Sequence, residues 1–202
     1  MLVIGLTGSI GMGKSTTAGM FRAHGVPVHD SDSTVHDLYR NEAVPLIEAQ
    51  FPGVTADGVV DRQKLAPLVI NDPDRMRALE SIVHPLVRAR ERAFLACERK
   101  AGARLAAVDI PLLLETRDPH SFDAIVVVTA APAVQRARVL SRPGMTEERF
   151  LAILAKQMPD AEKRKRAHFV IDTGDGLLDA EGQVAGVLRA LAAGQKGSDS
   201  HA

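Results

Sequence analysis

Residues 8–15 read Gly8-Ser9-Ile10-Gly11-Met12-Gly13-Lys14-Ser15 and join two segments with different hydrophobic patterns. The run before them, Leu2 to Leu6, is apolar, as buried parallel strands are. The stretch after them, Lys14 to His24, has the periodicity of an amphipathic helix. This octapeptide matches G-x-x-x-x-G-K-[ST] in the strand-to-helix context that a phosphate-binding loop requires. The alternative is a glycine-rich turn that happens to end in Lys-Ser, but the flanking patterns favour the phosphate loop.

A loop of this kind uses glycines because its backbone must turn tightly and present N–H groups to phosphate oxygens above a helix N-terminus. The candidate ATP-binding residues here are Gly8, Gly11, Met12, Gly13, Lys14, Ser15 and Thr16. We expect Lys14 to reach the β- and γ-phosphates and to take part in catalysis. Ser15 is expected to supply one oxygen ligand to Mg²⁺, which otherwise keeps its waters and phosphate ligands.

The rest of the chain alternates strand and helix patterns. Further apolar, β-branched runs lie at Val26 to His29, Leu105 to Asp109, Ala124 to Thr129 and His168 to Asp172. Helical patterns lie at Pro132 to Leu140, Thr146 to Gln157 and Leu177 to Leu191. This alternation predicts an α/β protein with a five-stranded parallel sheet of the P-loop NTPase type.

The gap between the second and third strand patterns, about 75 residues, is far longer than a crossover helix needs. Helical candidates fill it at Ser33 to Arg40, Ala43 to Phe51, Arg62 to Ile70 and Pro73 to Lys100. We therefore expect a core at residues 1–32 and 105–193, a helical acceptor-binding insert at 33–104, and a disordered tail at 194–202.

The insert is the only part large enough to form a second pocket, so it is predicted to bind the acceptor. Its candidate residues are Asp61, Arg62, His84 and Arg88. For His84, a structural role is the alternative to a substrate contact.

Carboxylates follow two of the predicted strands. Asp30-Ser31-Asp32 ends the second strand, where ligands bind in open α/β sheets. Asp32 is predicted to be the general base, with a helix cap before Ser33 as the alternative. Asp109 ends the third strand and is expected to hold Mg²⁺ through water, or else to accept N–H bonds from a loop.

Arg138 and Arg142 lie four residues apart on one helical face. Together with the reversal at Pro143-Gly144, they predict a helical lid at about residues 131–160 that closes over nucleotide phosphates. Arg142 is expected to be catalytic as well as ATP-binding. A solvated helix face is the alternative reading of these arginines.

The composition excludes several classes of protein. Lys plus Arg and Asp plus Glu number 25 each, so no global charge draws the chain to nucleic acid or to an anionic membrane. The densest charge run, Glu162 to Arg166, is predicted to be a solvated helix face. No apolar run approaches the roughly 20 residues of a membrane helix, and no secretory signal is evident, so we expect a cytoplasmic protein. The single cysteine, Cys97, is expected to be a buried small hydrophobe.

Several longer motifs make the chain resemble the dephospho-coenzyme A kinase family. They are Gly58-Val59-Val60-Asp61-Arg62, Leu79-Glu80-Ser81-Ile82-Val83-His84-Pro85, Pro111-Leu112-Leu113-Leu114-Glu115, Gln135 and Gln157. The resemblance implies transfer of the ATP γ-phosphate to the 3′-hydroxyl of 3′-dephospho-coenzyme A, with Mg²⁺. It also implies Asp32 as the base and an acceptor site that includes Pro111, Leu112 and Leu113. His168 and Thr173 depart from the family pattern near the expected adenine pocket.

Two other classes remain open at this point. One is another P-loop small-molecule kinase, acting on a nucleoside or a nucleoside monophosphate. The other is a non-catalytic nucleotide switch, but the sequence contains no guanine-reading N-K-x-D segment.

Overall fold

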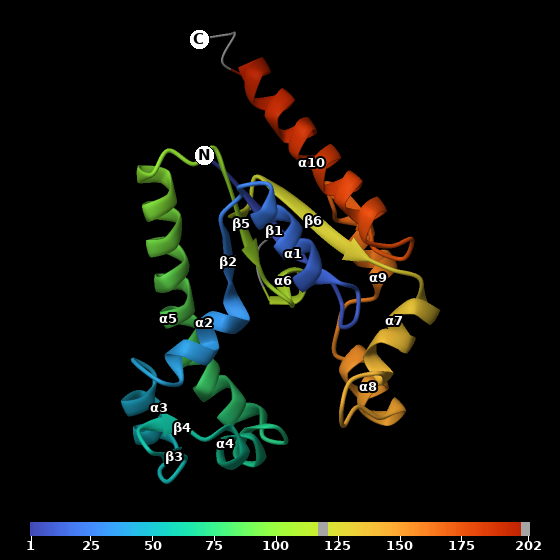
Figure 1. The fold of residues 1–202 in the computed structure, drawn as a ribbon. Helices are drawn as coiled ribbons and strands as arrows, with labels where there is room; N and C mark the ends of the chain where they lie inside the picture. Colours follow the sequence, from blue (N-terminus) through green and yellow to red (C-terminus); the bar gives the residue numbers. More distant parts are fainter. Residues whose placement is uncertain (117–120, 199–202) are drawn as a thin grey trace. The chain divides into compact units, whose positions relative to one another are not determined.

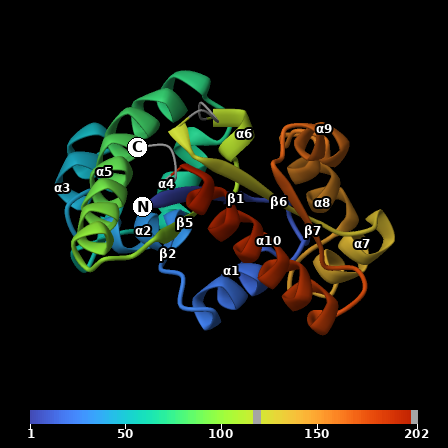
Figure 2. The ribbon, with the colours of Figure 1, turned by 90° about the horizontal axis from the view of Figure 1, so that it is seen from above.

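The computed structural model describes residues 1–116 and 121–198. Its main sheet has five strands in the order β2-β5-β1-β6-β7 (Figure 1 and Figure 2). They are β1 (Leu2–Thr7), β2 (Val28–Asp30), β5 (Leu105–Asp109), β6 (Ala124–Thr129) and β7 (Phe169–Asp172). β1 pairs in parallel with β5 and β6, and β6 pairs in parallel with β7. The predicted fold class is confirmed.

Helices cover both faces of this sheet (Figure 2). On one face, α1 (Lys14–Ala23) lies beside α10 (Leu177–Ser198), and Phe21 and Val184 pack into a core with Ile4 and Val126. The short helices α6 (Leu113–Thr116) and α9 (Asp160–Lys165) lie on the other face. Outside the sheet, α7 (Pro132–Leu140) and α8 (Glu147–Leu154) pack against each other.

Residues 30–101 form a second compact unit, distinct from the unit made by residues 1–29 and those from 102 onward. It contains α2 (Ser31–Leu38), α3 (Val44–Gln50), α4 (Arg62–Val69) and α5 (Pro73–Lys100), with β3 (Thr55–Ala56) and β4 (Val59–Val60) as a hairpin. Its core includes Leu38, Ile47, Phe51, Leu65 and Leu79. The unit begins and ends three residues earlier than the predicted insert.

Local capping explains where the helices of this unit begin. The Asp72 carboxylate accepts from the N–H groups of Asp74 and Arg75, both at 3.0 Å, just before Pro73. This cap starts α5 at its predicted position.

Before the β3–β4 hairpin, Glu48 accepts from the N–H of Gly53 at 2.7 Å and from that of Thr55 at 3.0 Å. These bonds, that of Gly53 first, hold the pKa of the Glu48 carboxyl below its usual value.

Three expectations need correction. The insert predicted to be helical also contains the β3–β4 hairpin, which lies between two predicted helices and turns tightly at Asp57 and Gly58, both of positive φ. Cys97 is exposed on α5, not buried. α10 continues through residues 194–198, where a tail was predicted, so Gly194 does not end the helix. Residues 199–202 lie outside the described part of the chain. Among the described residues, no helix is long and apolar enough to cross a membrane.

Candidate active site

The loop between β1 and α1 has the backbone geometry of an anion site. Gly13 adopts a φ of 91° and precedes α1 without capping it through a side chain, so the first-turn N–H groups stay available to a ligand. Gly8 passes so close to β6 that a Cβ there would lie 2.7 Å from the Val128 carbonyl oxygen. The sequence forms this loop because glycine alone satisfies both requirements.

Lys14 forms an ion pair with Asp109, and their side chains are 14% and 2% exposed. The pair arises because β1 and β5 are neighbours, with Leu6 in register with Asp109, so both strands end at the same edge. The structure thus joins a predicted phosphate-binding lysine to a predicted metal-associated carboxylate. Ser15 lies exposed at the start of α1.

Bound Mg²⁺ usually takes only a few oxygen ligands from protein and keeps its waters and phosphate oxygens. The described residues contain no cluster of three or more His, Cys, Asp or Glu side chains arranged for a metal. The Ser15 hydroxyl and the Asp109 carboxylate, which pairs with the adjacent Lys14, are oxygen donors of the kind that magnesium takes when it arrives with a nucleotide.

Residues distant in sequence hold the loop in place. The buried Met12 packs in the core and its Sδ accepts from the Ala130 N–H at 3.1 Å, so only its backbone can face a ligand. The Thr173 hydroxyl donates to the Met12 carbonyl at 2.8 Å. Arg138 in turn donates to the Thr173 hydroxyl and carbonyl, both at 2.7 Å. At this position, where the sequence departs from the family pattern, threonine braces the loop.

The family departure at His168 also has a structural role. Its Nδ1 accepts from the Ile125 N–H at 3.0 Å, and its own backbone N–H donates to the Ile125 carbonyl at 2.9 Å. His168 therefore secures the start of β7 against β6.

A pocket of about 320 Å³ lies beside the loop. Its lining includes Gly13, Thr16, Arg138, Arg142 and Leu177. The structure thus brings the two predicted lid arginines and the phosphate loop together around one cavity. Arg142 is exposed, whereas Arg138 is half-buried and bound to Thr173.

Asp30, the last residue of β2, and Asp32 do not share a strand face, because α2 begins at Ser31, earlier than predicted. Asp30 is the helix cap, and its Oδ1 accepts from the Ser33 N–H at 3.0 Å. Asp32 lies one residue into α2 and is exposed. The capping role therefore falls to Asp30, which leaves the Asp32 carboxylate for other chemistry.

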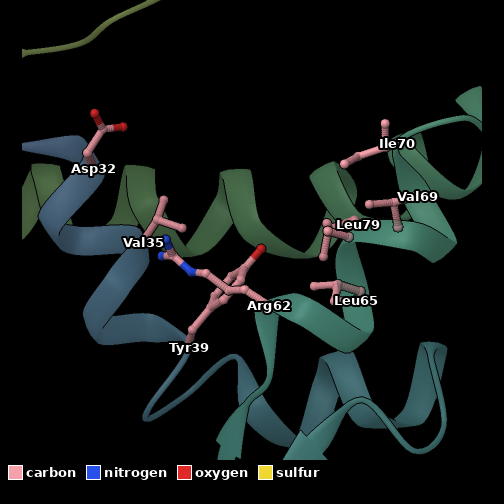
Figure 3. A pocket seen from close by; sticks show the side chains of 9 residues that line it. Asp32, Val35, Tyr39, Arg62, Leu65, Val69, Ile70 and Leu79 are labelled. Atoms are coloured by element: carbon pink, nitrogen blue, oxygen red, sulfur yellow. The ribbon is translucent and has the colours of Figure 1, made fainter. Parts of the chain in front are cut away.

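Asp32 lines a pocket of about 520 Å³ within the second unit (Figure 3). Val35 on α2 and Tyr39 just after it continue the wall, and Leu65, Val69 and Leu79 give the pocket an apolar floor. The Arg62 guanidinium lies 5.1 Å from the centre of the Tyr39 ring, a cation–π contact. Burial raises the pKa of the Tyr39 hydroxyl, and the Arg62 charge opposes that rise. This pocket combines apolar surface with one carboxylate and one guanidinium.

Other predicted acceptor residues lie elsewhere. Asp61 caps α4 by accepting from the N–H groups of Gln63 and Lys64 at 2.8 and 3.3 Å. His84 and Arg88 are exposed one turn apart on α5, outside the lining of the pocket in Figure 3.

The three residues predicted after β5 differ in what they offer. The Pro111 carbonyl accepts from the Thr7 hydroxyl at 3.1 Å, and Leu112 is exposed. Leu113 is fully buried, and a Cβ at Gly5 would lie 2.6 Å from its Cδ1. The side chain of Leu113 is therefore part of the core.

Sequence reasoning missed a buried ion pair. Lys163, in the charge run predicted to be solvated, has a fully buried side chain 2.9 Å from Glu115 Oε1. The same carboxylate oxygen accepts from the Met158 N–H at 2.8 Å. The run itself, one glutamate followed by four basic residues, does not indicate that one lysine points inward, because the partner of Lys163 lies 48 residues earlier in the chain.

The site combines a phosphate loop and its lysine with a carboxylate at the end of the neighbouring strand and an arginine-lined pocket, all on a five-stranded parallel sheet. These are the features of a P-loop kinase. The sequence model described as Dephospho-CoA kinase matches residues 2–179, and the chain belongs to this family.

Individual relatives agree with this assignment. The protein named Dephospho-CoA kinase in Agrobacterium fabrum is 60% identical over 193 residues, which cover 96% of this chain and all of the relative. The one in Mesorhizobium japonicum is 59% identical and covers 98% of this chain and all of the relative. A crystal structure from Thermus thermophilus has 36% sequence identity and a TM-score of 0.83, covering 94% of this chain and 96% of that one.

Proposed function

We propose that this chain transfers the γ-phosphoryl group of ATP to the 3′-hydroxyl of 3′-dephospho-coenzyme A, which gives coenzyme A. The phosphate loop with the Lys14–Asp109 pair supports the kinase part of the proposal. It offers N–H groups and a lysine for nucleotide phosphates and a carboxylate for a metal ion, which phosphoryl transfer from a nucleotide requires. Family membership over most of the chain supports the acceptor.

The nucleotide is assigned to the first unit. Backbone N–H groups of the loop and the start of α1 bind its phosphates, and Lys14 turns from Asp109 to the β- and γ-phosphates. The pocket between Thr16, Arg138 and Leu177 takes the nucleoside. Arg142 is exposed at its rim and supplies charge to the phosphoryl oxygens during transfer. Ser15 would supply one oxygen ligand to a magnesium ion, Asp109 would hold that ion through water, and the ion would neutralise phosphate charge.

Asp32 is the proposed general base. It lies exposed in the pocket of the second unit and is free of the capping bond that occupies Asp30. A carboxylate in this role accepts the proton of the acceptor hydroxyl and orients that hydroxyl for attack. Asp30→Asn is the matched control, since an asparagine cap preserves the start of α2.

The pocket of the second unit supports acceptor binding there. Its apolar floor suits an uncharged chain of the acceptor, and the Arg62 guanidinium suits a phosphate oxygen. His84 and Arg88 offer a further polar surface one turn apart on α5. We also place the activity in the cytoplasm, where ATP is supplied.

The decisive experiment measures ADP release and the phosphorylated product with a panel of acceptors: dephospho-coenzyme A, nucleosides, nucleoside monophosphates and shikimate. We expect turnover with dephospho-coenzyme A and mass-spectrometric detection of coenzyme A. Faster turnover of a nucleoside or its monophosphate would reassign the acceptor. Nucleotide binding without transfer to any acceptor would instead favour a switch protein.

A further inference from the structure

The backbone N–H and the backbone carbonyl of Ile10, in the phosphate loop, each form a hydrogen bond with a glutamine side chain. The N–H donates to Gln157 Oε1 at 3.1 Å, and the carbonyl accepts from Gln135 Nε2 at 2.8 Å. Gln135 is 5% exposed and lies on α7, whereas Gln157 follows the end of α8. The two glutamines therefore come from opposite ends of the segment that carries Arg142.

The next two loop residues are held from the same side of the molecule. Gly11 adopts a φ of 78°, and a Cβ there would lie 2.5 Å from Val139 Cγ2 and 3.0 Å from the Gln135 carbonyl oxygen, so α7 rests directly on the loop. The Met12 carbonyl accepts from Thr173, to which Arg138 donates. Three consecutive loop residues are thus fixed by α7 or by a residue bound to it.

We propose that Gln135 and Gln157 are positioning residues that set the shape of the phosphate loop. They occupy the outward polar groups of Ile10 and keep the loop open, so that the N–H groups beyond it stay directed at the nucleotide phosphates. Since α7 carries both Gln135 and Arg138, the loop and the pocket arginine keep a fixed relation. The inference rests on the proposed function only in that the loop binds nucleotide phosphate.

The roles of the two amides are opposite, and that makes a sharp test. Gln157 acts as an acceptor, a role that a glutamate oxygen also fills. Gln135 acts as a donor, a role that glutamate cannot fill, and its carboxylate would face the Ile10 carbonyl. Gln135→Glu and Gln157→Glu add the same charge beside the same residue, but only Gln135→Glu loses its hydrogen bond to Ile10.

The affinity for ADP, measured by calorimetric titration, reads the loop without any acceptor. We expect Gln135→Glu to weaken ADP binding by about tenfold or more, as loss of a buried hydrogen-bond partner implies, and Gln157→Glu, which keeps the acceptor and only adds charge near the phosphates, to weaken it clearly less. Gln157→Leu, which removes the acceptor, should weaken binding as Gln135→Glu does. The exposed Gln50→Glu on α3 adds the same charge away from the loop and is the matched control.

Gln135→Leu covers the case in which a buried carboxylate prevents folding, since it removes the donor without adding charge. It should also weaken ADP binding, while the Michaelis constant for the acceptor stays unchanged. Equal ADP affinities in Gln135→Glu and Gln157→Glu, or in Gln157→Glu and Gln157→Leu, would overturn the proposal. Failure of the native chain to phosphorylate dephospho-coenzyme A would overturn the acceptor assignment alone, because ADP binding involves no acceptor.

Discussion

Replacing Lys163 by methionine removes the counter-charge of Glu115 while it keeps most of the buried volume. Breaking a buried ion pair from one side costs about 3–5 kcal/mol, because the remaining charge stays in a poor solvent. Glu115 is 15% exposed and keeps its bond from the Met158 N–H. Partial solvation and that bond reduce the penalty, so we expect Lys163→Met to lower the free energy of unfolding by about 2–4 kcal/mol.

Thermal and urea denaturation measure this loss. For a chain of this size, each kcal/mol corresponds to about 2–4 °C in Tm, so Tm should fall by about 4–16 °C. Lys165→Met is the matched control on the same helix, because Lys165 is 70% exposed and its pair with Glu162 contributes little. Adding Glu115→Gln to Lys163→Met should recover part of the loss. If Lys163→Met and Lys165→Met unfold at the same urea concentration, the buried pair does not stabilise the fold as argued.

Three further outcomes follow from the described contacts. Lys14→Ala should lower kcat by at least about a hundredfold and also lower Tm, since the buried Asp109 loses its lysine. Adding Asp109→Asn should restore Tm but not turnover. Near-native turnover in either variant would contradict the assignment of Lys14. Asp32→Asn should lower kcat by about 10² to 10⁴ with ATP affinity preserved, as steady-state kinetics at saturating Mg²⁺ would show; an unchanged kcat would exclude Asp32 as the base. Glu48→Gln should destabilise the chain most above pH 4.5, because the Gly53 bond lowers the pKa of Glu48 in the folded state and the stabilisation from that bond disappears as the native carboxyl is protonated. Denaturation of both chains across a pH series measures this. A difference in unfolding free energy between native and variant that grows on acidification would contradict it.

The sequence predicted well whatever is specified by neighbouring residues. The phosphate loop is predictable from the sequence because its glycine spacing, the preceding apolar run and the following helix occur within about 25 residues. β6 was recognised because Ala124 to Thr129 is buried on both faces and therefore apolar throughout. α5 begins where Asp72 and Pro73 predicted, since a cap and a first-turn proline act locally.

What the sequence did not reveal depends on residues that meet only in the folded chain. The inward direction of Lys163 is set by Glu115 on another helix, and the bracing role of Thr173 by the Met12 carbonyl. Asp30, and not Asp32, caps the helix because α2 begins at the residue immediately after β2. Helix boundaries shift by such amounts through hydrogen bonds that pattern alone does not resolve.

The parallel pairing of β1 with β5 also has a consequence for synthesis of the chain. Leu2 is in register with Leu105, so β1 cannot pair with β5 until about a hundred further residues have been synthesised. At translation rates of about 5–20 residues per second, that interval lasts roughly 5–20 s. The helical unit, whose residues are contiguous and have their own core, emerges complete within it. A ribosome-bound nascent chain therefore exposes an unpaired apolar strand beside a finished neighbour, which makes that stage the one at which chaperone binding would matter most.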